Sequence, residues 1–177
     1  FTEASNTNLP DHTPDTGTGW TRIIEVGVCT LAIDASVDVL AGDNSDDDCS
    51  ASEGALYQTD DDVGADDYEV IVTSTSSDSN DDYNWIACRI QDSNNFYAYQ
   101  WNEDDGQLHK RTSGTFSHLG SATAGVANGS EVKLICNGST ISVEDDSSET
   151  VSVSDSDHSS GGLSLIHISE PTRPSSI

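Results

Sequence analysis

Basic residues are scarce in this chain of 177 residues. Six Lys and Arg stand against 32 Asp and Glu, which gives a formal net charge of −26 at pH 7. Nucleic acids and anionic membrane surfaces attract proteins through basic patches, so we expect no nucleic-acid partner. The sequence also lacks any run of 18 apolar residues, and we therefore expect no membrane insertion.

Methionine and metal-binding cysteine motifs are absent as well. Because there is no Met, we expect Phe1 to follow a processed N-terminus, after removal of a signal peptide, or to be the edge of a larger chain. The cysteines Cys29, Cys49, Cys88 and Cys136 form no C-x-x-C pair and have no adjacent His. This pattern favours disulfides over zinc. We therefore expect a secreted protein or one on a cell or virion surface.

Catalytic motifs are also missing. The chain has no G-x-S-x-G elbow and no E-x-D-x-x-E arrangement on an expected strand. A retaining glycosidase needs two carboxyl groups about 5 Å apart across the scissile bond. Here the carboxylates cluster in Gly/Asn/Asp/Ser-rich loops, where we expect water to solvate them. We expect a protein that is not an enzyme.

The residues that are present alternate between apolar and polar, which is typical of strands with one buried face. We find no internal repeat and no interior linker, and predict a single all-β domain over residues 1–162. The expected fold is a two-sheet antiparallel β-sandwich. Its expected strands are residues 20–28, 31–39, 56–57, 68–73, 85–90, 96–101, 108–110, 132–136, 141–143 and 151–153.

Several short motifs follow one another in a familiar order, at residues 11–20 (DHTPDTGTGW), 65–70, 89–97, 108–111, 132–143 and 157–158. Together they resemble the laminin-G-like, concanavalin A-like domains of phage structural proteins and bacterial exported proteins. The resemblance spans residues 1–162 and implies a jelly roll. That fold hosts lectins, glycan-binding modules, glucanases and structural domains, so the fold alone does not decide the function.

The end of the chain departs from this family. Residues 163–173 (LSLIHISEPTR) resemble the conceptual translation of a sequencing-library adaptor, so we expect residues 163–177 to lie outside the domain. The alternative is a genuine C-terminal strand followed by a Pro-bounded tail. The family adds a final strand after residues 157–161, and its loss would leave an open sheet edge. Residues 1–10, or a strand from a second copy, could fill that edge.

Two acidic loops are candidate calcium sites. Oxygen-bearing side chains alternate at Asp78, Asn80 and Asp82, and a second group contains Asp43 and Asp47. Calcium prefers clustered oxygen ligands. Both loops fail to complete the EF-hand pattern. No cofactor is certain, and two interpretations stay open: a loop site for Ca²⁺, or solvated acidic turns.

Aromatic residues provide a candidate carbohydrate site. Tyr97, Tyr99 and Trp101 alternate on one face of their strand, and the opposite face carries Phe96, Ala98 and Gln100. One of these faces must be core. The aromatic residues therefore form either a sugar platform or part of the packing.

The sequence also predicts covalent features. Cys88 and Cys136 each share a face with apolar residues of their strands, so of the three connectivities we favour Cys29–Cys49 with Cys88–Cys136. Asn128 and Asn137 each begin an N-x-S glycosylation pattern. The pair Asn137-Gly138 also predicts a type I′ hairpin turn.

Two functions follow from these observations. The first is a structural or assembly module that self-associates by strand addition or head to tail, as a subunit of an extracellular filament or part of a surface or virion protein. The alternative is a lectin-like, carbohydrate-binding adhesion module, with or without calcium.

Overall fold

The computed structural model describes the backbone of residues 7–8, 11, 19–26, 31–34, 39–42, 54–59, 65–74 and 84–166. It describes side chains for residues 11, 19–22, 57, 65–74 and 84–162. Within these ranges the regular elements of two residues or more are β-strands, as the alternation predicts. A helix long and apolar enough to cross a membrane is absent from this described part of the chain.

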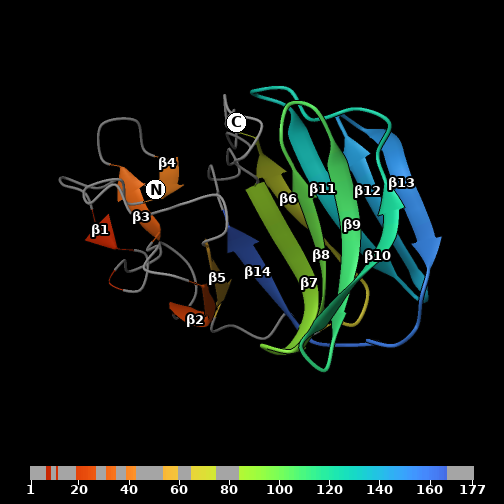
Figure 1. The fold of residues 1–177 in the computed structure, drawn as a ribbon, viewed down its shortest axis with the longest axis horizontal. Coiled ribbons are helices and arrows are strands. Elements are labelled where there is room, and N and C mark those ends of the chain that lie inside the picture. Colours follow the sequence, from red (N-terminus) through yellow and green to blue (C-terminus); the bar gives the residue numbers. More distant parts are fainter. Residues whose placement is uncertain are drawn as a thin grey trace, which may run out of the picture.

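The strands follow the chain in a single series, coloured in that order in Figure 1. They are β1 (Thr7–Asn8), β2 (Trp20–Val26), β3 (Leu31–Asp34), β4 (Val39–Gly42), β5 (Gly54–Thr59), β6 (Tyr68–Thr73), β7 (Asn84–Asp92), β8 (Asn95–Trp101), β9 (Gly106–Thr112), β10 (Thr115–Ser121), β11 (Glu131–Asn137), β12 (Thr140–Asp145), β13 (Ser148–Ser154) and β14 (Gly162–Ile166).

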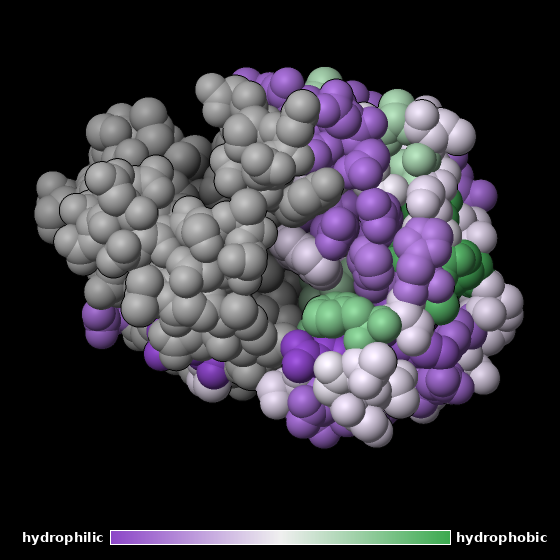
Figure 2. Space-filling view, viewed as in Figure 1, coloured by the Kyte–Doolittle hydropathy of each residue, from purple (hydrophilic) through white to green (hydrophobic). Residues whose placement is uncertain are grey.

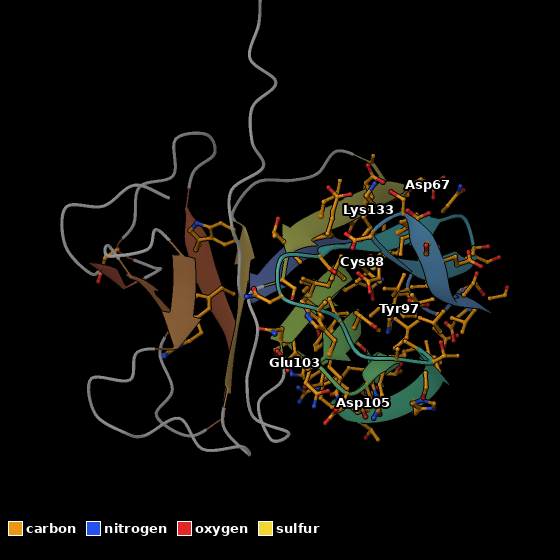
Figure 3. The ribbon with its side chains drawn as sticks, turned by 90° about the horizontal axis from the view of Figure 1, so that it is seen from above. Asp67, Cys88, Tyr97, Glu103, Asp105 and Lys133 are labelled. Carbon is orange, nitrogen blue, oxygen red and sulfur yellow. A yellow bond between two sulfur atoms is a disulfide. The ribbon has the colours of Figure 1, made fainter. Side chains whose placement is uncertain are left out.

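Two of the sheets form the sandwich. A seven-stranded sheet has the order β10-β9-β8-β7-β14-β5-β2, and a four-stranded sheet has the order β13-β12-β11-β6. In Figure 1 strands β7–β10 lie in front of β11–β13, and Figure 3 shows the two layers from above. A small third sheet has the order β1-β3-β4. The predicted antiparallel β-sandwich is confirmed.

The core lies between these two layers and follows from strand alternation. In β11 the residues Val132, Leu134 and Cys136 are buried, whereas their sequence neighbours are partly or fully exposed. They pair with β6, whose inward residues include Val70 and Val72. The remaining core side chains are Ile86, Cys88, Tyr97, Tyr99, Trp101, Leu108, Val126, Ile141, Val143 and Val151.

A disulfide joins the two layers. Cys88 on β7 and Cys136 on β11 are bonded to each other, as predicted, and are separated by 48 positions in the sequence. Both are buried, and Figure 3 shows Cys88 between the sheets. The other predicted pair, Cys29–Cys49, lies outside the described residues.

The β11–β12 hairpin is present but its turn differs from the prediction. Asn137 pairs with Thr140, so the two central residues are Gly138 and Ser139. Of these, Gly138 has a positive φ of 56° and Ser139 does not. Glycine at the first central position is the type II′ pattern, so the predicted type I′ turn is wrong. The predicted turn has Asn137 and Gly138 as its two central residues, whereas in the structure these are Gly138 and Ser139.

Two strand predictions also need correction. The single strand expected at residues 31–39 is two strands, β3 and β4, because Asp34 pairs with Val39 and the chain reverses between them. Strand β10 was not expected at all. Its sequence, TFSHLGS, is mostly polar and exposed and has no alternation that marks a strand.

The last strand, β14, occupies the position that we expect to be open when the domain ends at residue 162. Strand β14 lies between β5 and β7, and its Leu165 pairs with Tyr57 on one side and Ile86 on the other. This corrects the expectation of an unfilled edge, since residues 163–166 belong to the sheet. Within residues 1–10, Thr7–Asn8 pairs with β3 in the small sheet and donates no strand to the sandwich. The adaptor resemblance of residues 163–173 stays a prediction.

Candidate functional site

Tyr97, Tyr99 and Trp101 point from β8 into the sandwich, and each has 0% of its surface exposed. The rings of Tyr99 and Trp101 stack with centroids 5.6 Å apart. The Trp101 indole Nε1 donates a hydrogen bond to Ser74 Oγ at 3.0 Å. A side chain without exposed surface cannot contact a saccharide. The sugar platform predicted at these three residues is therefore wrong, because this face of β8 is the core face.

The opposite face of the same sheet carries a different aromatic surface. Side chains from β7, β8, β9 and β10 gather there, and we call this group the outer-face cluster. Its members are Trp85, Phe96, His109, Arg111, Phe116 and His118. Figure 2, which views this side of the molecule, shows an apolar area over β9 and β10 bordered by hydrophilic side chains.

The strand register explains why these residues meet. Residues directly opposite each other in antiparallel strands point to the same face. One row crosses β8, β9 and β10 through Phe96, Arg111 and Phe116. The neighbouring row, two residues along each strand, contains His109 opposite His118. The cluster is therefore built on paired strands, which hold its side chains in fixed relative positions.

The rings of the cluster touch one another in a continuous series. Trp85 stacks on His109 with centroids 5.9 Å apart and an interplanar angle of 28°. Phe116 lies 5.9 Å from the rings of both Trp85 and Phe96. His118 meets His109 edge-on at 5.7 Å. Phe96 is buried, but Phe116 has 45% of its surface exposed and presents the cluster to solvent.

Arg111 adds a cation to this aromatic surface. Its Cζ lies 5.0 Å from the centroid of Phe116 and 5.9 Å from that of Phe96. Such cation–π contacts contribute about 1 kcal/mol each when partly buried. The Nε of Arg111 is buried and has no hydrogen-bond partner. Its guanidinium forms no ion pair with a carboxylate of the described residues.

The histidines contribute hydrogen-bonding groups. Burial, and then the nearby His118, lowers the pKa of His109 below its ordinary 6.5. His109 is therefore neutral at pH 7, with one ring nitrogen that donates and one that accepts. Its buried Nε2 has no partner, whereas the Nε2 of His118 lies 2.9 Å from Ser121 Oγ.

Amide side chains border the rings. Gln100 on β8 lies opposite Trp85 on one side and Gln107 on the other, so all three share the outer face. The Nε2 of Gln107 donates to Asp105 Oδ2 at 3.2 Å. Ring faces bind the apolar face of a sugar, while amides, imidazoles and guanidinium groups bond its hydroxyls. This combination can hold a saccharide.

A second polar cluster, partly buried, connects strands β8 and β9 to the residues that follow β13. The ammonium of Lys110 lies 2.5 Å from Asp155 Oδ2 and 2.6 Å from Asp157 Oδ2. The hydroxyl of Tyr97 donates to Asp155 Oδ1 at 2.5 Å. Burial raises the pKa of Asp155, but the bonds from Lys110 and Tyr97 outweigh it and the pKa is lowered. An ionised Asp155 cannot act as the protonated carboxyl that a glycosidase requires.

Arg89 forms a further set of polar contacts between segments that are distant in the sequence. It is buried, with 1% of its surface exposed. Its Nε donates to the carbonyl of Asp66 at 3.1 Å, its Nη1 to the carbonyl of His158 at 3.2 Å, and its Nη2 to Asp67 Oδ1 at 3.2 Å. The motif residues at 89–97 and 157–158 thus contact one another within the fold, which gives them a structural role.

The predicted calcium sites lie in a part of the chain that the structure does not describe. The calcium-ligand candidates Asp43, Asp47, Asp78, Asn80 and Asp82 lie outside the described residues, and calcium stays a prediction. Within the part of the chain that the structure describes, no group of three or more His, Cys, Asp or Glu side chains is arranged to hold a metal ion.

The two candidate glycosylation residues, Asn128 and Asn137, are both exposed. A glycan attached at either position would project into solvent. Their modification stays a prediction.

Comparison with known proteins bears on the fold. No family model matches the chain, and no curated protein does. Among solved structures the chain is similar to the carbohydrate-binding module CBM66 from Bacillus subtilis, with a TM-score of 0.61 and 16% sequence identity. The match covers 86% of this chain and 88% of that chain. The protein therefore shares the β-sandwich fold of that module.

Proposed function

We propose that this protein is a non-catalytic carbohydrate-binding module and that the outer-face cluster is its binding surface. The observation that carries the proposal is the series of touching rings from Trp85 to Phe116, edged by imidazole, guanidinium and amide groups. The fold that the chain shares with a carbohydrate-binding module supports the same function.

The assembly function has less support. The argument for self-association by strand addition depends on an unfilled strand position in the sandwich. Strand β14 occupies that position, between β5 and β7. Strand addition from a second copy would therefore need another edge. The described outer strands of the sandwich are β10, β2, β13 and β6.

The setting we propose is extracellular. The Cys88–Cys136 disulfide supports it, because such bonds persist in oxidising compartments. The strongly acidic composition keeps such a module soluble and away from anionic surfaces. Adhesion to a glycan-bearing surface is the role that fits these features.

The test compares two exposed apolar side chains on opposite faces of the sandwich. Phe116 belongs to the outer-face cluster and is 45% exposed, whereas Ile71 lies on β6 in the other sheet and is 38% exposed. Wild-type protein, Phe116→Ala and Ile71→Ala are screened on a glycan array and by affinity electrophoresis in soluble polysaccharides. Removal of a ring that stacks on a sugar costs on the order of 1 kcal/mol or more.

We expect wild type to bind at least one saccharide, Phe116→Ala to bind it about fivefold or more weakly, and Ile71→Ala to bind it as wild type does. Absence of binding by folded wild-type protein to every saccharide would overturn the proposed function. Equal weakening by both substitutions would overturn the assignment of the surface.

A further inference from the structure

We infer that the saccharide bound by the outer-face cluster is acidic, and that Arg111 binds its carboxylate or sulfate group. The inference rests on the proposed function and names its substrate class. It starts from the charge of the cluster in a chain that is otherwise strongly acidic.

Cations in the described part of the protein are mostly neutralised within the molecule. Arg89 is paired with Asp67, Lys110 with Asp155 and Asp157, and Lys133 with Glu131. Arg111 differs from these three, because none of the described carboxylates forms an ion pair with it. In a chain with 32 acidic and six basic side chains, a cation without such a partner is unusual.

The position of this cation suits a ligand. Its guanidinium is held over Phe116 and Phe96, so its orientation is fixed before a ligand arrives. Its Nε is buried and has no hydrogen-bond partner, but Arg111 as a whole is only partly buried, so an acceptor would approach the two Nη nitrogens. A planar guanidinium matches a carboxylate or sulfate through two parallel hydrogen bonds.

The neighbouring residues strengthen the preference for an anion. His109 and His118, in the next row of the same face, can each donate a hydrogen bond to an oxygen anion. The amide of Gln107 lies further along β9 on the same face. The rings of Trp85 and Phe116 are left for the sugar itself.

The net charge of the protein makes this binding selective. A chain with net charge −26 repels polyanions at long range, so nonspecific attraction cannot produce the affinity. An acidic saccharide that binds must do so through local contacts. The two sources of such an anion, a uronate carboxylate and a sulfate ester, can be distinguished by the ligands used.

The experiment measures affinity by isothermal titration calorimetry for matched pairs of ligands. The first pair is oligogalacturonate and its fully methyl-esterified form, and the second is dextran sulfate and dextran. The variants are Arg111→Gln, Arg111→Lys and the control Lys133→Gln. The control removes the same charge from β11 in the other sheet. Thermal melts confirm that each variant is folded.

We expect wild type to bind one acidic ligand at least tenfold more tightly than its neutral partner. Arg111→Gln should lose that preference, Arg111→Lys should keep only part of it, and Lys133→Gln should keep all of it. Preference for the uronate identifies a carboxylate, and preference for dextran sulfate identifies a sulfate ester.

Equal affinity for acidic and neutral ligands, unchanged in Arg111→Gln, would overturn the inference. If Phe116→Ala still weakened both ligands, the proposed carbohydrate function would stand without it. Absence of binding to either member of both pairs, while the array shows a neutral saccharide as ligand, would also overturn the inference and leave the function intact.

Discussion

The buried guanidinium of Arg89 allows a sharp test of how the sandwich is held together. We consider the substitution Arg89→Ala. It removes hydrogen bonds to the carbonyls of Asp66 and His158, and an ion pair with Asp67. The carboxylate of Asp67 is 60% exposed and regains water, so its loss contributes little. The two carbonyl bonds decide the result.

The magnitude follows from these contacts. A hydrogen bond from a charged donor contributes about 1.5–3 kcal/mol. The carbonyl of His158, a buried residue, would be left without a donor at a cost of about 1–3 kcal/mol, whereas that of the exposed Asp66 can bond to water. Removing the buried charge of Arg89 also removes its desolvation cost, which offsets part of this loss of stability. The cavity left by the long side chain increases the loss. We expect Arg89→Ala to lower the free energy of unfolding by about 3 kcal/mol, or Tm by about 6–12 °C in a chain of this size.

The backbone at this position provides the control. Arg89 has a positive φ of 49°, which costs a residue with a Cβ about 1–2 kcal/mol and costs glycine almost nothing. We therefore expect Arg89→Gly to be more stable than Arg89→Ala by about 1 kcal/mol. Urea unfolding followed by Trp fluorescence measures both. The reasoning is refuted if Arg89→Ala unfolds within about 0.5 kcal/mol of wild type, or if the glycine variant is the less stable of the two.

Three further predictions concern the interior. Burial raises the pKa of Tyr97 and of Tyr99 to about 12. Between pH 10 and 12 these two hydroxyls therefore stay protonated in the folded protein but are ionised in the unfolded chain. Stability should fall as pH rises from 10 towards 12, and tyrosinate absorbance that shows all tyrosines titrating near pH 10 in folded protein would contradict this. Replacement of both Cys88 and Cys136 by alanine should lower unfolding stability by about 4 kcal/mol in the chain-entropy model, and a melt equal to wild type would argue against it. Gly161→Ala should cost about 2 kcal/mol or more, because φ is +137° and a Cβ would lie 2.6 Å from the backbone of β7; an unchanged denaturation midpoint would show that the backbone can yield.

The features that sequence predicted correctly are local. Alternation marks β11 and β6 because each strand has one inward face that must be apolar. The same alternation places Cys88 and Cys136 on inward faces, and their disulfide follows from it. The pair Asn137-Gly138 predicts the position of the hairpin after β11 correctly, but it does not predict the turn type correctly.

The candidate site was missed because it depends on which strands are neighbours. Strand β8 has apolar residues on both faces, and alternation cannot say which face is the core. The alternative set, with Phe96 and Ala98, was noted in the sequence as the opposite face. Its partners Phe116 and His118 lie on β10, whose polar sequence gave no strand signal.

The order of strands in the sheet was the least predictable property. Strand β14 lies beside β7 although the paired residues are 72 or more positions apart in the chain, from Gly162 with Ile90 to Ile166 with Trp85. The sequence of neither segment indicates so distant a partner. Arg89 was part of a motif, but its role depends on carbonyls supplied by residues 66 and 158. Only the folded arrangement reveals those acceptors.

The most direct test of carbohydrate binding at the outer face is the indole region of an ¹H–¹⁵N correlation spectrum during titration with a saccharide found to bind. The chain has three tryptophans. Trp85 belongs to the outer-face cluster, whereas Trp101 is fully buried and its indole is bonded to Ser74. A Trp85→Phe variant assigns the first signal. We predict that the saccharide shifts the Trp85 indole signal and leaves that of Trp101 in place. Binding that leaves the Trp85 signal unmoved would contradict the account.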